Sequence, residues 1–181
     1  MKKTLLAVAL SSLSIAASAE NWKLAPAFTD GAFKFAPTIA ATVSTVKPQG
    51  GSSETAYGVE LNFNCGLIQS PDNRIRTHLS FSRADGDKYD ATVVELSPRY
   101  TVPLGEGFSV GVGPSLGAAR VDSATVGVPT ETVFAYGVVA GLNYRKGALY
   151  AGLDFGMRRT SEQSSVDFDS RAATLKVGFN F

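Results

Sequence analysis

The chain has 181 residues and a mass of 19.0 kDa, a size that suits one domain. With 44% hydrophobic residues, only 18% charged residues and 18 glycines, the composition excludes charge-driven disorder and disfavours long surface-charged helices. A formal net charge of +1 provides no basic field for nucleic acid, and one cysteine permits no intramolecular disulfide. We therefore expect one folded, rather apolar domain.

Residues 1–19 have the features of a cleavable signal peptide. Two lysines precede an apolar run of 13 residues, LLAVALSSLSIAA, and an Ala-Ser-Ala cleavage site occupies positions 17–19. A membrane-spanning helix would need about 20 apolar residues, which this run does not provide. We expect export beyond the inner membrane, followed by a short lead-in, residues 20–32 around Trp22, that is either periplasmic or interfacial.

From residue 33 onward, apolar residues alternate with small or polar ones at a period of two, which is typical of β-strands. In the clearest segment, residues 57–67, Tyr, Val, Leu, Phe, Cys and Leu alternate with Gly, Glu, Asn, Asn and Gly. Eight such segments are predicted: residues 34–43, 57–67, 75–82, 94–102, 108–117, 134–142, 151–158 and 174–181.

The polar faces of these segments carry mid-strand charges and many glycines. On the surface of a soluble sandwich, which is the alternative, Lys, Glu and Thr should crowd this face and Gly should be scarce. A narrow lumen fits better, because inward residues must be small or paired while apolar residues face lipid. The sequence therefore predicts an all-β fold, an eight-stranded antiparallel up-and-down transmembrane β-barrel over residues 33–181, with no edge left unpaired in hydrocarbon.

Aromatic residues gather toward the ends of the predicted strands, as the girdles of membrane barrels require. Tyr100, Phe108 and Tyr144 are expected near one interface, and Tyr57 and Tyr136 near the other.

The connections between strands alternate in length. The tight connections 69–74, 103–107 and 145–147 are expected on the periplasmic side, where such barrels have short turns. Four others are then expected to face outward: residues 46–54, 83–88, 120–131 and 159–170.

Eight amphipathic strands behind a leader, ending in LKVGFNF, resemble the small outer-membrane β-barrels related to the OmpA transmembrane domain and the OmpX/Ail group. The most specific part is the last strand, where Leu175, Val177, Phe179 and Phe181 match the alternating hydrophobic assembly signal of such proteins. The resemblance implies a Gram-negative outer-membrane location and a porin-like barrel. Implied partners are outer-membrane lipid, lipopolysaccharide, the barrel-assembly machinery and periplasmic chaperones.

The inward charges are expected to form ion pairs, because unpaired charges in a narrow interior are costly. Glu95 is expected to pair with Arg76 or Arg99, and Asp154 with Lys176. An interior about filled by side chains predicts a packed polar plug, with a narrow gated pore as the alternative. The expected inward set is Lys34, Glu60, Arg76, His78, Glu95, Arg99, Asp154, Arg158 and Lys176.

An enzymatic alternative rests on three of these strand residues. Folding of the hairpin about residues 85–88 is expected to set His78 opposite Glu95, with Ser80 on the same face. A hydroxyl nucleophile needs such a base and carboxylate, and the His-x-Ser spacing resembles that of lipid A deacylases. In that family, however, the motif lies near the C-terminus and faces lipid, so we expect no enzymatic activity.

Two other features are interpreted more simply. The segment ADGDKYD is expected to form a hairpin turn rather than a calcium loop, and Cys65 is expected on the lipid-facing register as a small hydrophobe. No cofactor or metal site is expected. The predicted function is a contribution to envelope integrity and to surface interaction through the outer loops, with a host or phage surface as a candidate partner.

Overall fold

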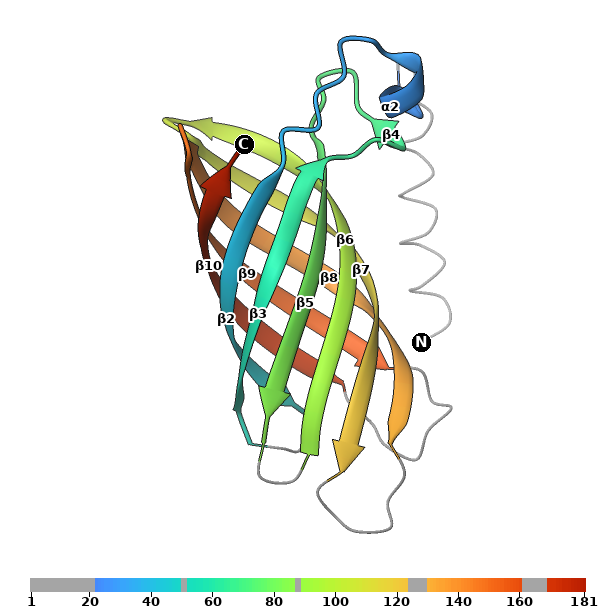
Figure 1. The fold of residues 1–181 in the computed structure, drawn as a ribbon, viewed down its shortest axis with the longest axis vertical. Coiled ribbons are helices and arrows are strands. Elements are labelled where there is room, and N and C mark those ends of the chain that lie inside the picture. Colours follow the sequence, from blue (N-terminus) through green and yellow to red (C-terminus); the bar gives the residue numbers. More distant parts are fainter. Residues whose placement is uncertain (1–21, 50–51, 87–88, 124–129, 161–168) are drawn as a thin grey trace, which may run out of the picture.

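The computed structural model describes residues 22–49, 52–86, 89–123, 130–160 and 169–181. Eight strands close into one antiparallel barrel in the order β10-β2-β3-β5-β6-β7-β8-β9 (Figure 1). The predicted signal peptide lies outside the described residues. The strands are β2 (Thr38–Pro48), β3 (Glu54–Asn64), β5 (Ile75–Asp85), β6 (Tyr89–Gly105), β7 (Phe108–Ser123), β8 (Glu131–Lys146), β9 (Leu149–Thr160) and β10 (Ser170–Asn180).

The two faces of the barrel wall differ as the alternation predicts. Along β2, buried and exposed residues alternate, with Thr38 and Ala40 inside and Ile39 and Val43 outside. The outer face is apolar: Phe155 and Met157 of β9 are more than half exposed. An apolar exterior around a closed wall excludes the soluble sandwich, and the predicted eight-stranded antiparallel barrel is confirmed.

Several strands are longer than predicted, above all β6, β7 and β8 with 17, 16 and 16 residues. At the ends of β7 and β8 that flank residues 124–130, the additional residues are 118–123 and 131–133, and β8 also continues beyond residue 142 to Lys146 at its other end. Near residues 124–130 the inward positions are Ala119, Val121, Val133 and Ala135, all buried. The outward positions there include the polar Arg120, Asp122 and Thr132, so the alternation that identified the strands is reversed in this part of the wall.

Two strands have different ends from those predicted. β2 begins at Thr38 rather than at residue 34, because Ala36 has a left-handed backbone with φ of 43° that interrupts extended chain. β3 ends at Asn64 rather than at residue 67. Cys65 follows the strand, donates its backbone N–H to the carbonyl of Ile75 and is buried. The expectation that Cys65 faces lipid is therefore wrong.

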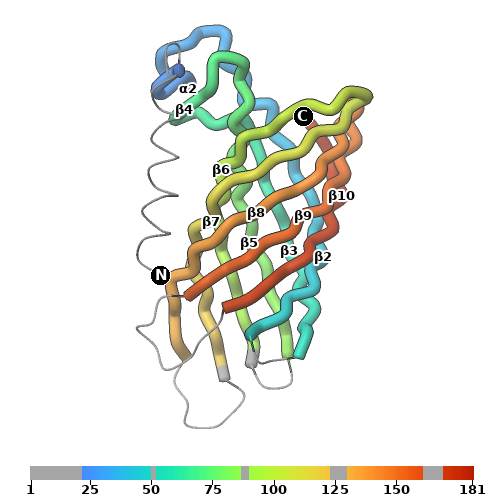
Figure 2. Tube along the Cα trace, turned by 180° about the vertical axis from the view of Figure 1, so that it is seen from behind, coloured from blue at the N-terminus to red at the C-terminus, as the bar shows by residue number. Residues whose placement is uncertain are grey.

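One end of the barrel has short turns, and we call it the short-turn end. The β6–β7 turn passes through Gly105, Glu106 and Gly107, all with positive φ, and the β8–β9 turn contains Gly147. A Cβ on Gly107 would lie 2.5 Å from the carbonyl oxygen of Arg145, so the close approach of β8 requires glycine there. The C-terminus and the β3–β5 connection lie at this end too, while the strand ends beside the other four connections lie at the opposite end, which we call the long-loop end (Figure 2).

The predicted lead-in folds against the β3–β5 connection at the short-turn end (Figure 1). Here β1 (Lys23–Leu24) pairs with β4 (Ile68–Gln69), and the four-residue α2 (Pro26–Thr29) follows β1. The connection predicted as a tight turn at residues 69–74 thus carries its own short strand. Within the part of the chain that the structure describes, no helix has the length and apolar character to cross a membrane.

We predict that the ion pair between Lys23 and Asp30 stabilises the N-terminal segment only above an acidic threshold pH. Lys23 donates a 2.8 Å hydrogen bond to Asp30, and this contact holds the Asp30 pKa below its ordinary value of 3.8. The folded-state pKa is lowered, so the pair stabilises the segment above pH 3.8 and is lost as the pH falls through the lowered value. Emission of Trp22, the only tryptophan in the chain, should change over that range in the wild type.

The matched variant is Asp30→Asn, which removes the titrating carboxylate. Its Trp22 emission should already differ from the wild type at pH 7 and should change less below pH 4. Identical titrations of the two proteins would contradict a role for the Lys23–Asp30 pair.

Candidate functional site

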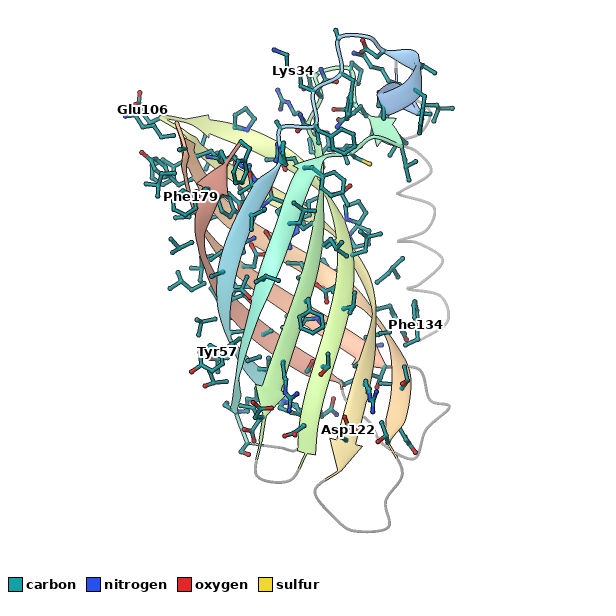
Figure 3. All side chains as sticks on the ribbon, in the orientation of Figure 1. Lys34, Tyr57, Glu106, Asp122, Phe134 and Phe179 are labelled. Atoms are coloured by element: carbon teal, nitrogen blue, oxygen red, sulfur yellow. The ribbon has the colours of Figure 1, made fainter. Side chains whose placement is uncertain are left out.

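The closed wall brings charged side chains from five strands into one interior. Eight of the nine predicted inward charged or histidine residues lie on inward positions, and six of them are almost completely buried: Glu60, His78, Glu95, Arg99, Asp154 and Lys176. Lys34 is the exception, because it precedes β2 and is exposed at the short-turn end (Figure 3). The prediction that Lys34 faces inward is therefore wrong.

Lys176 is the centre of the ion-pair network. Its Nζ lies 3.1 Å from Oε1 of Glu60 and 2.8 Å from Oδ2 of Asp154, and the side chain is fully buried. The same Asp154 oxygen accepts a 2.7 Å hydrogen bond from Arg99. The expected Asp154–Lys176 pair is thus present, and it continues through shared carboxylates to strands β3 and β6.

Glu95 pairs with Arg158, across the barrel, instead of with Arg76 or Arg99 as predicted. Glu95 and Arg99 share a face of β6 but are four residues apart, which places their backbones about 13 Å from each other. Inward side chains from different strands meet inside a narrow barrel, so Arg158 of β9 reaches Glu95 and Arg99 reaches Asp154. Strand spacing alone could not have given these partners.

Two glycines make room for the network. A Cβ on Gly141 would lie 2.0 Å from Oδ1 of Asp154, and one on Gly152 would lie 2.8 Å from Cε of Lys176. These positions explain why glycines alternate with charges on the inward faces: the barrel can hold the long ionic side chains only where the neighbouring wall has no side chain.

The sequence reasoning missed a second polar group at the short-turn end. Tyr150 is completely buried and donates a 2.7 Å hydrogen bond to Asn143, while the guanidinium of Arg145 lies 4.9 Å from the Tyr150 ring centroid. Arg145 also donates to Oδ1 of Asn62 at 2.6 Å. The sequence predicts a turn at residues 145–147, but β8 continues to Lys146. Tyr150 shares the inward parity of Asp154, which was the available signal.

The arrangement expected for an acyl hydrolase is not formed. In the observed register His78 is opposite Ser97, and Ser80 is opposite Glu95. The carboxylate partner of His78 is Glu60, with Nδ1 to Oε1 at 2.9 Å. No hydrogen bond joins Ser80 to His78 in the described part of the chain. The predicted Ser80, His78 and Glu95 alignment was wrong by two residues in register, because the hairpin closes later than expected.

Two cavities inside the described wall are small. One of about 40 Å³ lies beside Glu60, Ser80 and Glu95. Another of about 80 Å³, toward the long-loop end, is lined mainly by alanine and valine, including Ala56, Ala119 and Val121. The interior therefore has three zones: arginines with Tyr150 at the short-turn end, an ion-pair network in the middle, and an apolar sleeve beyond it.

Aromatic side chains surround the outer wall near both ends. Tyr57 and Phe134 lie toward the long-loop end and Phe179 toward the other (Figure 3). Phe108 packs on Tyr144 at 4.8 Å between ring centroids. Of the residues predicted for the girdle, Tyr57, Tyr100, Phe108 and Tyr136 are exposed on this surface and Tyr144 is half-buried.

The part of the chain that the structure describes holds no cluster of His, Cys, Asp and Glu suited to a metal ion. In the segment ADGDKYD, Asp85 and Asp90 both face Arg83, whose nitrogens lie 2.6 Å and 3.3 Å from their carboxylate oxygens.

Solved structures of small bacterial surface barrels share this architecture. The Neisserial surface protein A (NspA) aligns with a TM-score of 0.61 and 14% identity, covering 81% of this chain and 95% of that one. The N-terminal β-barrel domain of Pseudomonas aeruginosa OprF aligns with a TM-score of 0.60 and 15% identity, covering 82% and 100%. Ail of Yersinia pestis aligns with a TM-score of 0.46 and 17% identity, covering 82% of this chain and 100% of that one. Neither a protein-family model nor a curated protein matches the sequence.

The chain has the fold of a small outer-membrane β-barrel. The expected resemblance is confirmed at this level by the first two structures. In this barrel the C-terminal strand lies at the closing seam, paired with β2 on one side and β9 on the other. The four residues predicted to form its assembly signal point outward and are exposed: Leu175, Val177, Phe179 and Phe181.

We predict that the small barrel loses stability when the central cation is removed. Lys176→Met leaves Glu60 and Asp154 without their shared ammonium partner in a buried site, which should cost about 3–5 kcal/mol of unfolding free energy. Urea unfolding of the refolded protein in lipid vesicles measures the change.

Lys146→Met is the matched control, because Lys146 is exposed at the end of β8. It should change the unfolding free energy by less than about 0.5 kcal/mol. Equal effects of the two substitutions would show that the Lys176 pairs do not stabilise the barrel.

Proposed function

We propose that the chain is a non-enzymatic outer-membrane β-barrel that contributes to envelope integrity and to surface interaction. The observation that carries the proposal is the combination of an apolar outer wall with an interior filled by paired charges. The apolar wall suits contact with lipid. Because side chains fill the interior, binding to other molecules is expected at the two ends of the barrel.

The proposed orientation places the short-turn end in the periplasm, following the general rule for such barrels. The C-terminus and the β1–α2–β4 segment then lie on the periplasmic side. The connections at residues 49–53, 86–88, 124–130 and 161–169 face outward, where lipopolysaccharide and a host or phage surface are the candidate partners.

The proposed route to this location begins with residues 1–19 as a cleaved signal peptide. Periplasmic chaperones and the barrel-assembly machinery are the proposed partners during biogenesis. Support comes from β10, whose alternate apolar residues end with Phe181 and remain exposed on the outer wall after closure.

Lipid A mass spectrometry tests the absence of catalysis. Cells that lack the protein, cells that express it and cells that express Ser80→Ala should give identical spectra, because His78 pairs with Glu60 and has no hydrogen bond to Ser80 among the described residues. A mass change that depends on Ser80 would make the protein an acyl hydrolase or transferase and would overturn the proposal.

The alternative of a narrow gated pore is tested in planar bilayers. We expect no discrete conductance from the wild type, because the chain of Glu60, Lys176, Asp154 and Arg99 fills the middle of the interior. Conductance steps that change in Glu95→Gln or Arg99→Gln would instead establish a pore.

Surface interaction is tested by shortening the two longest connections. Replacement of residues 124–130 and 161–169 by two-residue turns should abolish attachment of expressing cells to host cells, while the barrel still folds. Shortening of residues 49–53 alone is the control for a general effect of loop removal. Attachment that is unchanged in the double replacement would exclude these connections as the contact surface.

A further inference from the structure

Among the described residues, two arginines at the short-turn end of the interior have no acidic partner within ion-pair distance. In the middle of the barrel, three carboxylates are matched by three cations: Glu60 and Asp154 by Lys176 and Arg99, and Glu95 by Arg158. Arg76 and Arg145 remain. Within the described residues, the C-terminal carboxylate included, no acidic oxygen lies within 4.0 Å of either guanidinium.

The two guanidinium groups meet at one neutral oxygen atom. Oδ1 of Asn62 accepts a hydrogen bond of 2.6 Å from Arg145 and one of 3.0 Å from Arg76. Like charges held this close repel each other, and an amide oxygen offsets little of that repulsion. The Nε atoms of both arginines are buried and have no hydrogen-bond partner in the described structure.

Surrounding contacts hold both groups in place. Arg76 donates to Oδ1 of Asn64 and to the carbonyl of Ala36, each at 2.8 Å, and Arg145 stacks on the ring of Tyr150. Arg76 lies one residue after the start of β5 and Arg145 one residue before the end of β8, so both are at the mouth. Both side chains are half-buried, so water and small solutes can reach them.

We propose that Arg76 and Arg145 form a binding site for a phosphate-type oxyanion at the short-turn mouth of the barrel. Paired guanidiniums bind oxyanions through parallel charge-assisted hydrogen bonds, and a fixed pair loses little side-chain entropy on binding. The bound anion neutralises the two unpaired charges of the interior. The exposed Lys34, whose backbone carbonyl accepts a 2.8 Å hydrogen bond from Asn64, adds positive charge to the same end.

Inorganic phosphate is the first probe. The full chain, refolded in an uncharged detergent, is titrated with phosphate against chloride of matched ionic strength, and binding is followed by calorimetry and by the thermal midpoint. Arg76→Gln and Arg145→Gln should each weaken phosphate binding about tenfold or more, the usual effect of losing hydrogen bonds to a charged group.

Two further variants separate anion binding from folding effects. Arg74→Gln alters an arginine at the same end that already has a partner in Asp72, and it should bind phosphate like the wild type. Asn64→Asp keeps both arginines but gives Arg76 a carboxylate in place of an amide oxygen, so it should weaken phosphate binding while the barrel remains folded.

A lipid arm identifies the source of the anion. Short-chain phosphatidylglycerol is compared with a diacylglycerol of the same chain length, which lacks phosphate. Stabilisation by phosphatidylglycerol at lower concentrations than inorganic phosphate, dependent on Arg76 and Arg145, would assign the site to a lipid headgroup. Equal potency would assign it to free phosphate. An unaltered phosphate response in both arginine variants, or no response in the wild type, would overturn the proposal.

Discussion

Lys176 places a positive charge in the barrel interior, where water cannot solvate it. The carboxylates of the interior are arranged to pair with this charge. An eight-stranded wall leaves space that side chains nearly fill, so a buried ammonium group must find carboxylates on other strands. Glu60 comes from β3 and Asp154 from β9, while Lys176 lies on β10. The Lys176–Glu60 contact crosses the β10–β2 seam, so closure of the barrel and neutralisation of its charges depend on each other.

The interior is not uniform along its length. Arginines and Tyr150 occupy the short-turn end, ion pairs the middle, and alanines and valines such as Ala119 and Val121 the remainder. The alternating faces of a strand have the same geometry throughout, so this zonation comes from side-chain chemistry alone. It makes the two ends different inside: one is positively charged and polar, and the other is apolar.

A filled interior restricts what the barrel can do. The two interior cavities, of about 40 and 80 Å³, are smaller than the pockets of about 300–1,000 Å³ that usually hold small ligands. The proposed functions therefore belong to the ends: surface contact at the long loops, and oxyanion binding at the mouth where Arg76 and Arg145 share an acceptor.

The existence of eight strands, the apolar exterior and most of the inward charged residues could be predicted from the sequence, because side-chain alternation is a local property that lipid and lumen impose on every strand. Lys34, which precedes β2, and Tyr150 and Arg145, which lie beyond the predicted strand ends, were exceptions. The prediction failed where that contrast reverses, as beyond Ala119, where Val121 is buried and Arg120 faces outward, or where the strand has ended, as at Cys65. Only the tertiary structure decided the partners. Arg158 rather than Arg99 pairs with Glu95, because closure of the wall brings β9 and β6, which are distant in the sequence, to a shared interior. Glu60 rather than Glu95 pairs with His78, because the β5–β6 register differs by two residues from the predicted one.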